Sequence, residues 1–426
     1  MGTCSNISPV DKCLAFIAHG VKALRDGNFT IAEGIFRTAL AGAKALLPEQ
    51  GRDLLPLALL NLSRLRPRQS REDDARQLRE QAIAQLEESP PSLPNAFFHF
   101  SMANVLMEFD EYRRAIPFWE QAIQLDDVKE PMDLAHMLAR VGACYNRSGL
   151  KDHAAIPLRA AIKIFRKYPE DPRFCDALIT LGNALRKSTP AEADACYREV
   201  ADWHVARGHW LSATPAWGNI GILCSEQDRY AEALEYFEKV RKTREQSPGV
   251  PAAAIAITLN NIANCYRRMG KFEEAFTAVS RAIDLLQDKE GRELASAYGT
   301  RGLIFLDQGN DTEAVEWLRK AYEHHQKLPS PNLDTIADDL NREIAALRRL
   351  GRADDLKDAE ARLALVHTAM KAVPQINRDL AALDGPVQCA IFIELNIGTR
   401  WRNLDEKRED VHLARMSHRG GGIDEN

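Results

Sequence analysis

The hydrophobic and polar positions of this chain repeat with a helical period, in blocks that recur along most of its length. In residues 258–286 (TLNNIANCYRRMGKFEEAFTAVSRAIDLL), apolar and small residues stand three and four positions apart on both sides of a Gly-Lys turn. This spacing places side chains on one face of an α-helix. The block therefore predicts two antiparallel helices that are joined near Gly270, each with one buried face.

A residue in the second predicted helix marks each block. The markers are Ala32, Ala75, Ala115, Ala154, Ala193, Ala233, Ala275, Ala314 and, in a weaker last copy, Leu356, which puts successive blocks 39 to 43 residues apart. Five positions before each marker comes a residue that tolerates a turn or a left-handed helix stop: Gly27, Ser70, Asp110, Gly149, Ser188, Asp228, Gly270, Gly309 or Gly351. This recurrence predicts one repeat array instead of several unrelated domains.

Two further positions indicate how the predicted helices pack. A small residue comes twelve positions before the marker, or eleven in the fifth block: Gly20, Ser63, Ala103, Gly142, Gly182, Gly221, Ala263 or Gly302. A large apolar residue usually follows the marker by four: Phe36, Trp119, Leu158, Tyr197, Phe237, Val279 or Leu318. We expect the small residue to let two helices approach closely and the large one to fill the next groove. Such a unit buries its apolar face only by stacking on its neighbours.

The blocks resemble the tetratricopeptide repeat, a helix-turn-helix motif with small, aromatic and alanine positions in a fixed order. The fullest matches are WGNIGILCSEQDRYAEALEYFEKV (217–240) and LNNIANCYRRMGKFEEAFTAVSRAI (259–283), and the resemblance covers about residues 12–365. The step between blocks is longer than the roughly 34 residues that are usual in the family. Together with the Leu-Asn-Asn opening, it resembles the kinesin light chain class of these repeats.

The resemblance implies an all-α fold, a right-handed superhelical solenoid of about nine helix-turn-helix units with a short C-terminal extension. We predict an N-terminal segment (1–11), the solenoid (12–365), a capping helix with an apolar extension (366–400), and a disordered tail (401–426). The apolar stretch VQCAIFIEL (387–395) is compatible with a short strand, a helix on the end of the stack, or a segment in the groove.

Composition narrows the expected environment and partners. Hydrophobic residues make up 45% of the chain and charged residues 27%, which is typical of a folded globular protein. A net charge of −5 provides no global positive field that would attract nucleic acid. The eight cysteines are dispersed without a CxxC pair, and no apolar run is long enough for an integral membrane segment. We expect a cytoplasmic protein; the alternative is lipid anchoring through Gly2 and Cys4.

Sequence motifs of enzymes are absent. There is no GxxxxGK[ST] phosphate loop, no GxSxG elbow, no HExxH and no GxGxxG after a strand. His204 and His209 are five residues apart and His324 and His325 are adjacent, so neither pair has the i, i+4 spacing that converges on one metal. The sequence therefore predicts no catalytic residue, no metal and no cofactor, and we do not expect an enzyme.

The resemblance also implies that the first helix of each unit lines a concave face that binds extended peptides or partner helices. Family groove positions fall two, three and six residues before the small residue, and one, four and five after it. On this sequence they select the candidate peptide-binding residues Asn104, Arg140, Asn183, Arg186, Asn219, Asn260, Asn261, Asn264, Arg267 and Arg268. An asparagine amide both donates and accepts, so a ladder of them can pair with the backbone of a ligand whatever its sequence.

The arginines of this set suggest which ligand is preferred. Guanidinium groups bind carboxylates through paired hydrogen bonds, so we expect a protein or peptide partner with an acidic or C-terminal segment. The competing interpretation is that the asparagines only form a neutral wet surface and that the arginines favour the C-terminal ends of their helices. Both interpretations remain open at the level of the sequence.

Three functions are compatible with this interpretation of the sequence. The first is a protein–protein interaction adaptor or scaffold that holds a partner's segment in the groove. The alternative is a peptide-responsive regulatory sensor, in which a bound peptide closes the superhelix and changes its fit to an effector protein. A third is a hydrolase that uses the C-terminal segment, but about 60 residues are marginal for an independent domain.

Overall fold

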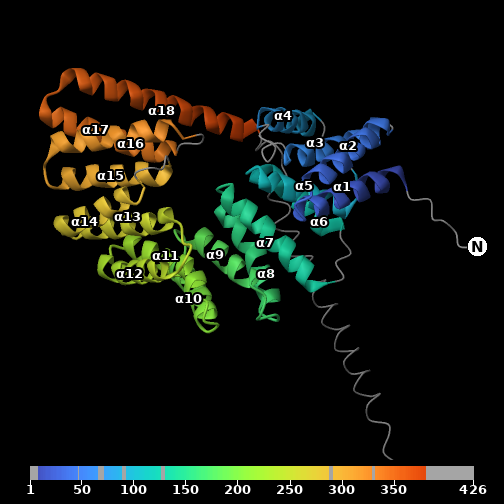
Figure 1. Ribbon diagram of the computed structural model, residues 1–426, viewed down its shortest axis with the longest axis horizontal. Helices are drawn as coiled ribbons and strands as arrows, with labels where there is room; N and C mark the ends of the chain where they lie inside the picture. Colours follow the sequence, from blue (N-terminus) through green and yellow to red (C-terminus); the bar gives the residue numbers. More distant parts are fainter. Residues whose placement is uncertain are drawn as a thin grey trace, which may run out of the picture. The chain divides into compact units, whose positions relative to one another are not determined.

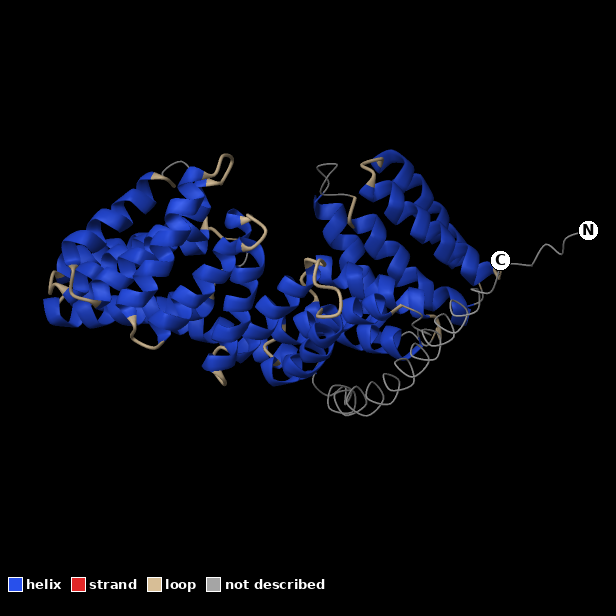
Figure 2. Cartoon of the chain, turned by 90° about the horizontal axis from the view of Figure 1, so that it is seen from below, coloured by secondary structure: helices blue, strands red, loops and turns tan. Residues whose placement is uncertain are grey.

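In this computed structural model, the structure describes residues 8–46, 48–65, 72–88, 93–125, 130–286, 291–328 and 332–379. Throughout these ranges the regular secondary structure is α-helical, and successive helices are joined by short turns (Figures 1 and 2). The predicted all-helical repeat fold is therefore confirmed for the described part of the chain. The chain divides into two compact units between Ala184 and Leu185.

The first unit contains the helices up to α9. They are α1 (Pro9–Arg25), α2 (Phe29–Ala45), α3 (Pro48–Ser63), α4 (Glu72–Glu88), α5 (Ala96–Glu108), α6 (Tyr112–Leu125), α7 (Pro131–Arg147), α8 (Lys151–Phe165) and α9 (Arg173–Leu185). Odd-numbered helices are the first helices of the predicted units. The markers of this half lie in α2, α4, α6 and α8, as the repeat predicts.

The second unit contains the helices from α10 onwards. They are α10 (Pro190–Val205), α11 (Trp210–Glu226), α12 (Tyr230–Gln246), α13 (Ala252–Arg268), α14 (Phe272–Asp284), α15 (Arg292–Asp307), α16 (Asp311–Gln326), α17 (Leu333–Leu350) and α18 (Ala353–Asp379). The remaining markers lie in α10, α12, α14, α16 and α18. Every predicted block is therefore one pair of helices.

Seven of the predicted turns inside the pairs adopt a left-handed backbone, whereas the predicted stop Ser188 does not and Ser70 lies outside the described residues. Positive φ angles occur at the predicted stops Gly27, Asp110, Gly149, Asp228, Gly270, Gly309 and Gly351. Gly351, with φ of 69°, ends α17 in the left-handed conformation, where its lack of a Cβ avoids a steric penalty. Asp228 adopts φ of 58°, a conformation that Asp tolerates better than most residues with a side chain.

The small and large positions of the repeat meet inside the same helix pair. An ideal Cβ placed on Gly20 would lie 2.4 Å from Cε1 of Phe36, so only glycine leaves room for this ring. Phe36 also packs with Leu62 and Leu65 of the next pair. The side chain of Phe36 thus packs between the two helices of its own pair and also against the next helix pair. This double contact explains how the units stack.

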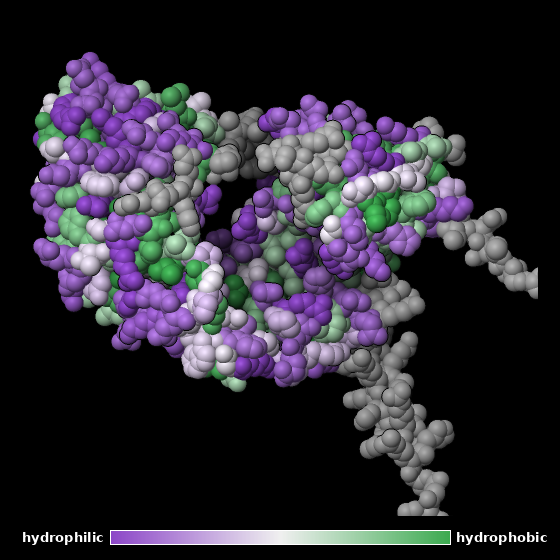
Figure 3. Space-filling model, in the orientation of Figure 1, coloured by the Kyte–Doolittle hydropathy of each residue, from purple (hydrophilic) through white to green (hydrophobic). Residues whose placement is uncertain are grey.

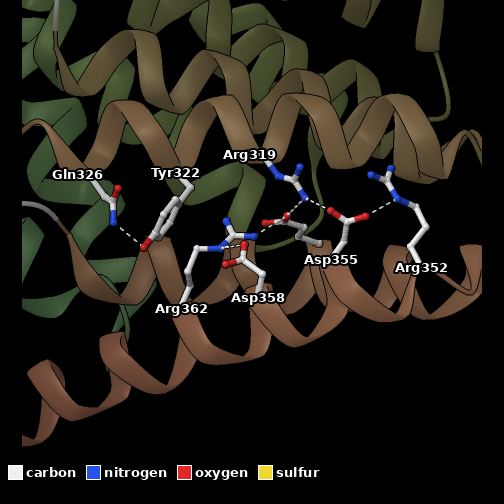
Figure 4. Close-up of polar contacts among 8 residues, drawn as sticks. Arg319, Tyr322, Gln326, Arg352, Asp355, Asp358 and Arg362 are labelled. Carbon is white, nitrogen blue, oxygen red and sulfur yellow. Dashed lines mark hydrogen bonds and ion pairs between the residues drawn. The ribbon is translucent and has the colours of Figure 1, made fainter.

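The last helix is attached by charges as well as by apolar contacts. Glu343 on α17 is 1% exposed, and its Oε1 accepts hydrogen bonds from Arg319 on α16 (3.4 Å) and Arg362 on α18 (2.9 Å). Asp355 on α18 accepts hydrogen bonds from Arg319 at 3.2 Å and Arg352 at 2.7 Å, as Figure 4 shows. These ion pairs connect α16, α17 and α18 in one network.

The predicted boundaries near the ends of the chain are only partly covered by the described residues. α1 starts at Pro9 inside the predicted N-terminal segment, with Ser8 Oγ accepting from the Asp11 amide at 3.1 Å. α18 runs without a break through the predicted boundary after residue 365. Residues 380–426 lie outside the described ranges, so the apolar extension and the tail remain predictions.

Candidate functional site

The first helices α11, α13 and α15 of the second unit contact one another directly. Ser225 Oγ of α11 lies 3.3 Å from Cys265 Sγ of α13 in a hydrogen bond. Asn264 Nδ2 of α13 donates to Thr300 Oγ1 of α15 at 3.1 Å. These contacts hold the three helices side by side (Figure 1). We call the outward residues of α11, α13 and α15 the first-helix face.

Outward residues of α11 and α13 recur at helical spacing. On α11 they are Leu211, Pro215, Asn219 and Ile222, and on α13 they are Ile257, Asn260, Asn261 and Asn264. Leu211 is 42% exposed and Ile257 is 45% exposed, so each helix presents a large apolar side chain to solvent on this face. Figure 3 shows apolar side chains gathered among polar ones in the part of the view where α11 and α13 lie.

Pro215 adds apolar surface to α11 without breaking the helix. Its nitrogen carries no hydrogen, so it cannot donate to the carbonyl of Leu211 one turn earlier. The hydroxyl of Thr214 donates to that carbonyl instead, at 2.7 Å. Because the orphaned acceptor is satisfied locally, α11 continues through the proline and keeps Asn219 on the same face.

Three of the predicted asparagines have unused hydrogen-bonding capacity. Asn219 and Asn261 are partly exposed, and their amides have no partner among the described residues. Asn260 Oδ1 is shielded from solvent and likewise has no partner in the described part of the chain. Since an amide can donate and accept at once, these groups can bind a peptide backbone.

Two other predicted asparagines are engaged inside the structure. Asn264 Nδ2 donates to the carbonyl of Asn260 and to Thr300, both at 3.1 Å. In the first unit, Asn104 donates to the carbonyl of Phe100 at 2.9 Å and accepts from Arg140 Nη2 at 3.2 Å. These contacts link the first helix of one pair to that of the next, so these predicted ligand residues have a structural role. Asn183 lies on α9 of the first unit.

The predicted arginines of the second unit already hold acidic partners. Arg186 Nε lies 3.2 Å from Glu226, and Arg267 Nη1 lies 2.5 Å from Asp307. Arg268 donates to the Tyr230 hydroxyl at 2.9 Å and lies 3.5 Å from Asp228. In each case the carboxylate belongs to a neighbouring helix pair. The arginines that the sequence suggested for a ligand's carboxylates therefore pair with carboxylates of the protein itself.

The part of the first-helix face that α11 and α13 form is uncharged over most of its length. α11 contains no Asp, Glu, Lys or Arg from Trp210 to Ser225, and α13 contains none from Ala252 to Tyr266. Sequence reasoning mapped the asparagines but missed Pro215 and Ile257. Both stand six positions before the small residue of their unit, which is one of the groove positions of the family, so the signal was present in the sequence.

The described ranges contain no metal-binding cluster, and their cysteine thiols are buried. There, no three His, Cys, Asp or Glu side chains come together to hold a metal ion. The described cysteines are buried, and burial raises the pKa of the Cys144 thiol to about 12 and that of Cys224 to about 11. Within the described helices, no segment is long and apolar enough to cross a membrane.

Comparison with known proteins agrees with this architecture. Residues 211–288 and 254–327 match the family model of the tetratricopeptide repeat. The apo form of RapI is 14% identical with a TM-score of 0.56, covering 86% of this chain and 99% of that one. The apo form of the quorum sensor NprR from B. thuringiensis is 13% identical with a TM-score of 0.53, covering 84% and 100%.

A third structure is similar over much of the same length. Aspartyl phosphate phosphatase F from Bacillus subtilis is 15% identical with a TM-score of 0.51, and the match covers 86% of this chain and 96% of that one. A search of curated proteins finds no significant match. The finer resemblance to kinesin light chain repeats stays a prediction. The family match falls on α11 to α16, so this part of the chain consists of tetratricopeptide-like repeats.

Proposed function

We propose that the protein is a noncatalytic, cytoplasmic interaction module that binds a segment of a protein or peptide partner on the first-helix face. The observation that carries this proposal is the pair Asn219 and Asn261. They occupy equivalent positions of consecutive units, are partly exposed, and have no hydrogen-bond partner among the described residues. Two such amides on adjacent helices can pair with successive backbone groups of one bound segment.

The surroundings of these amides favour binding over a merely hydrated surface. The helices are fixed by the contacts Ser225–Cys265 and Asn264–Thr300, so the face is formed before a ligand arrives. A preformed site avoids the entropy cost of ordering loops. Exposed apolar side chains lie beside the amides. The removal of their surface from water, when a partner covers it, contributes favourably to the free energy of binding.

A binding selection tests this proposal before the partner is identified. A random peptide library displayed on phage is selected on the full chain, and the recovered peptides are measured on the double variant Asn219→Ala, Asn261→Ala. We expect affinity to fall about tenfold or more, because truncation of central contacts dominates binding energies. The matched control Asn341→Ala changes an exposed asparagine of α17 and leaves affinity unchanged. No enrichment, or equal binding to the double variant, contradicts the proposal.

A peptide-responsive sensor is the second candidate. RapI and NprR share the fold over most of this chain, and the name of NprR identifies it as a quorum sensor. A sensor changes shape when the peptide binds, whereas an adaptor holds its partner on a fixed face. Small-angle X-ray scattering with a saturating selected peptide distinguishes them: a smaller radius of gyration supports the sensor, and an unchanged one supports the adaptor.

An acidic or C-terminal segment is the partner that the arginines would favour. Such a segment would have to replace carboxylates that the protein itself supplies. The Arg268–Asp228 pair is the easiest to exchange, because its side chains are 54% and 76% exposed and an exposed ion pair contributes little. Selected peptides that require Arg268 and lose affinity with added salt would support this partner.

A further inference from the structure

We infer that the segment bound on the first-helix face is uncharged and is anchored by apolar side chains that cover Leu211, Pro215 and Ile257. This inference rests on the proposed function and specifies the chemistry of the partner. The observations that carry it are the distribution of charge along α11 and α13, the exposure of their apolar residues, and the order of apolar and amide positions on both helices.

Charge is confined to one end of these helices. Glu226 ends α11, and Arg267 and Arg268 end α13, while the fifteen or so positions before them are neutral in a chain with 27% charged residues. Each of these end charges is paired with a neighbouring helix pair. A charged ligand side chain placed farther along the face would lose water without gaining a partner, which is unfavourable.

Apolar residues fill the part of the face that lacks charge. Leu211 is 42% exposed and Ile257 45%, and Pro215 is also exposed. The contacts Ser225–Cys265 and Asn264–Thr300 fix the helices that carry these side chains. A rigid apolar surface of this kind is a typical anchor point of an interface.

The same order of apolar and amide positions occurs on both helices. Pro215 precedes Asn219 by four residues on α11, and Ile257 precedes Asn261 by four on α13. Four residues are one helical turn, or about 6 Å along the axis. The face therefore has a row of apolar residues with Pro215 and Ile257, which we call the apolar lane. One turn away lies a parallel row with Asn219 and Asn261, which we call the amide lane. One lane suits side chains of the ligand and the other suits its backbone.

The distance between the helices sets the spacing of the anchors. Packed helix axes lie about 8–10 Å apart, and an extended chain advances about 3.3 Å per residue. A segment that crosses from α11 to α13 therefore presents two apolar residues about three positions apart, one to Leu211 and Pro215 and the other to Ile257. The ligand class is a neutral, extended segment with paired apolar anchors.

The amide lane does not continue onto α15. At the position of Asn219 and Asn261, α15 has Thr300, which is buried and accepts the hydrogen bond from Asn264. The next outward position, Gly299, is also buried, with Asp339 of α17 3.2 Å from where its Cβ would lie. The accessible amides are thus confined to α11 and α13, which limits the contact to a short segment.

The test compares peptides selected on the full chain with variants of the apolar lane. We expect enriched peptides to carry two apolar residues about three positions apart and no acidic residue between them. Ile257→Glu lowers their affinity about tenfold or more, because it places an unpaired charge against the anchor. Ile257→Leu retains binding, and Leu365→Glu, on a 70% exposed residue of α18, is the matched control without effect.

Ionic strength gives an independent readout. The affinity of a neutral anchored peptide changes less than about twofold between roughly 50 and 500 mM salt, whereas an acidic ligand weakens as charges are screened. Peptides that require Asn219 and Asn261 but are acidic and sensitive to salt would overturn this inference and leave the proposed function intact. Enriched peptides whose affinity is unchanged by the substitutions Asn219→Ala and Asn261→Ala would instead overturn the proposed function. Equal affinity for the wild type and Ile257→Glu would also refute the apolar anchor.

Discussion

The ring of Phe237 on α12 occupies the space beside Gly221 of α11, where an ideal Cβ would lie 2.7 Å from Cε1 of the ring. Phe237 is 2% exposed, so it is held by packing on all sides. The large residue after the marker and the small residue before it are therefore a matched pair. The recurring small and large positions of the repeat correspond to this contact. The number of residues between them follows from the geometry of two antiparallel helices.

Replacement of Gly221 by alanine should destabilise the second unit. The added methyl overpacks the contact with Phe237 at a cost of about 1–3 kcal/mol, which exceeds the gain of about 0.5–1 kcal/mol from removing a helix glycine. Gly218→Ala is the matched control three residues earlier, where no atom lies within 4 Å of the new Cβ. Thermal unfolding followed by circular dichroism should show a lower midpoint for Gly221→Ala and a slightly higher one for Gly218→Ala. Equal shifts would contradict the packing argument.

The buried carboxylate of Glu343 should be essential for the attachment of α18. It accepts from Arg319 and Arg362, whose side chains are 34% and 13% exposed. Glu343→Gln leaves two guanidinium groups without their shared counter-charge, and removal of one partner of a buried pair typically costs about 3–5 kcal/mol. Because Arg319 is partly hydrated and still pairs with Asp355, and Arg362 still pairs with Asp358, we expect about 2–3 kcal/mol here. Hydrogen exchange of the α18 amides should accelerate.

Glu360→Gln provides the control for that experiment. Glu360 pairs with Arg348 at 2.8 Å on the same two helices, but the side chains are 46% and 63% exposed. An exposed pair contributes about 0–1 kcal/mol, so exchange in α18 should stay close to that of the wild type. If Glu343→Gln exchanges as slowly as Glu360→Gln, the network in Figure 4 does not hold α18.

Asp339 on α17 should reduce stability at neutral pH. Burial raises its pKa from 3.8 to about 6, and the nearby Arg342, 3.3 Å away, compensates only in part. The folded state therefore favours the protonated form, so the stabilising contribution is complete below pH 3.8 and is lost as the pH rises toward 6. Asp339→Asn should be more stable than the wild type above pH 6, by about 2–3 kcal/mol, and similar to it at acidic pH.

Urea unfolding at several pH values checks this expectation. The control Asp338→Asn changes the adjacent exposed carboxylate, which is the smallest of the causes of the raised pKa of Asp339, and should stay close to the wild-type curve. The expected signature is a difference between Asp339→Asn and the wild type that grows with rising pH. A difference that is constant with pH would mean that the charge of Asp339 is not the cause.

The fold could be predicted almost completely because the repeat encodes local contacts. Gly27 and Asp228 indicate their left-handed turns, and the contact of Gly221 with Phe237 lies within one pair. The partners of Asn264 could not be predicted in this way. Thr300 stands in the next unit, and nothing in the block of Asn264 reveals which of its outward residues will meet it. A single block shows which residues face outward, but not which of them reach the neighbouring helix.

The charge network of the last pair was missed for the same reason. The final block is degenerate as a repeat because Leu356 and Glu360 replace the alanine and the large apolar residue of the pattern. In the structure, an electrostatic contact between Glu343 and Arg362 joins α17 to α18, beside apolar packing that includes Ile344 and Ala359. A repeat pattern that consists of apolar positions cannot predict a buried ion pair. In the last block it shows only that the usual alanine and large apolar residue are missing.

The asparagines of α13 should separate into structural and ligand-binding residues. Asn264→Ala removes the bonds to Asn260 and Thr300 and the weaker bond from Arg267 Nε, and leaves the buried Thr300 hydroxyl with one bond fewer, at a cost of about 1–2 kcal/mol. Asn261→Ala removes a partly exposed amide without a described partner and should change the unfolding free energy by less than about 0.5 kcal/mol. Chemical denaturation of both variants tests this. Equal losses would mean that Asn261 is also structural.

His325 on α16 should make the second unit sensitive to acid. His325 is 1% exposed, and both ring nitrogens lack a hydrogen-bond partner among the described residues. Burial lowers the pKa of the ring, and the nearby Arg292 and His324 lower it further. The neutral ring is favoured in the folded state, so its contribution is full above about pH 6.5 and is lost as the pH falls below it. His325→Leu should flatten this acid-side loss in urea unfolding, whereas the exposed His209→Leu should not. Parallel curves for wild type and His325→Leu would refute this role.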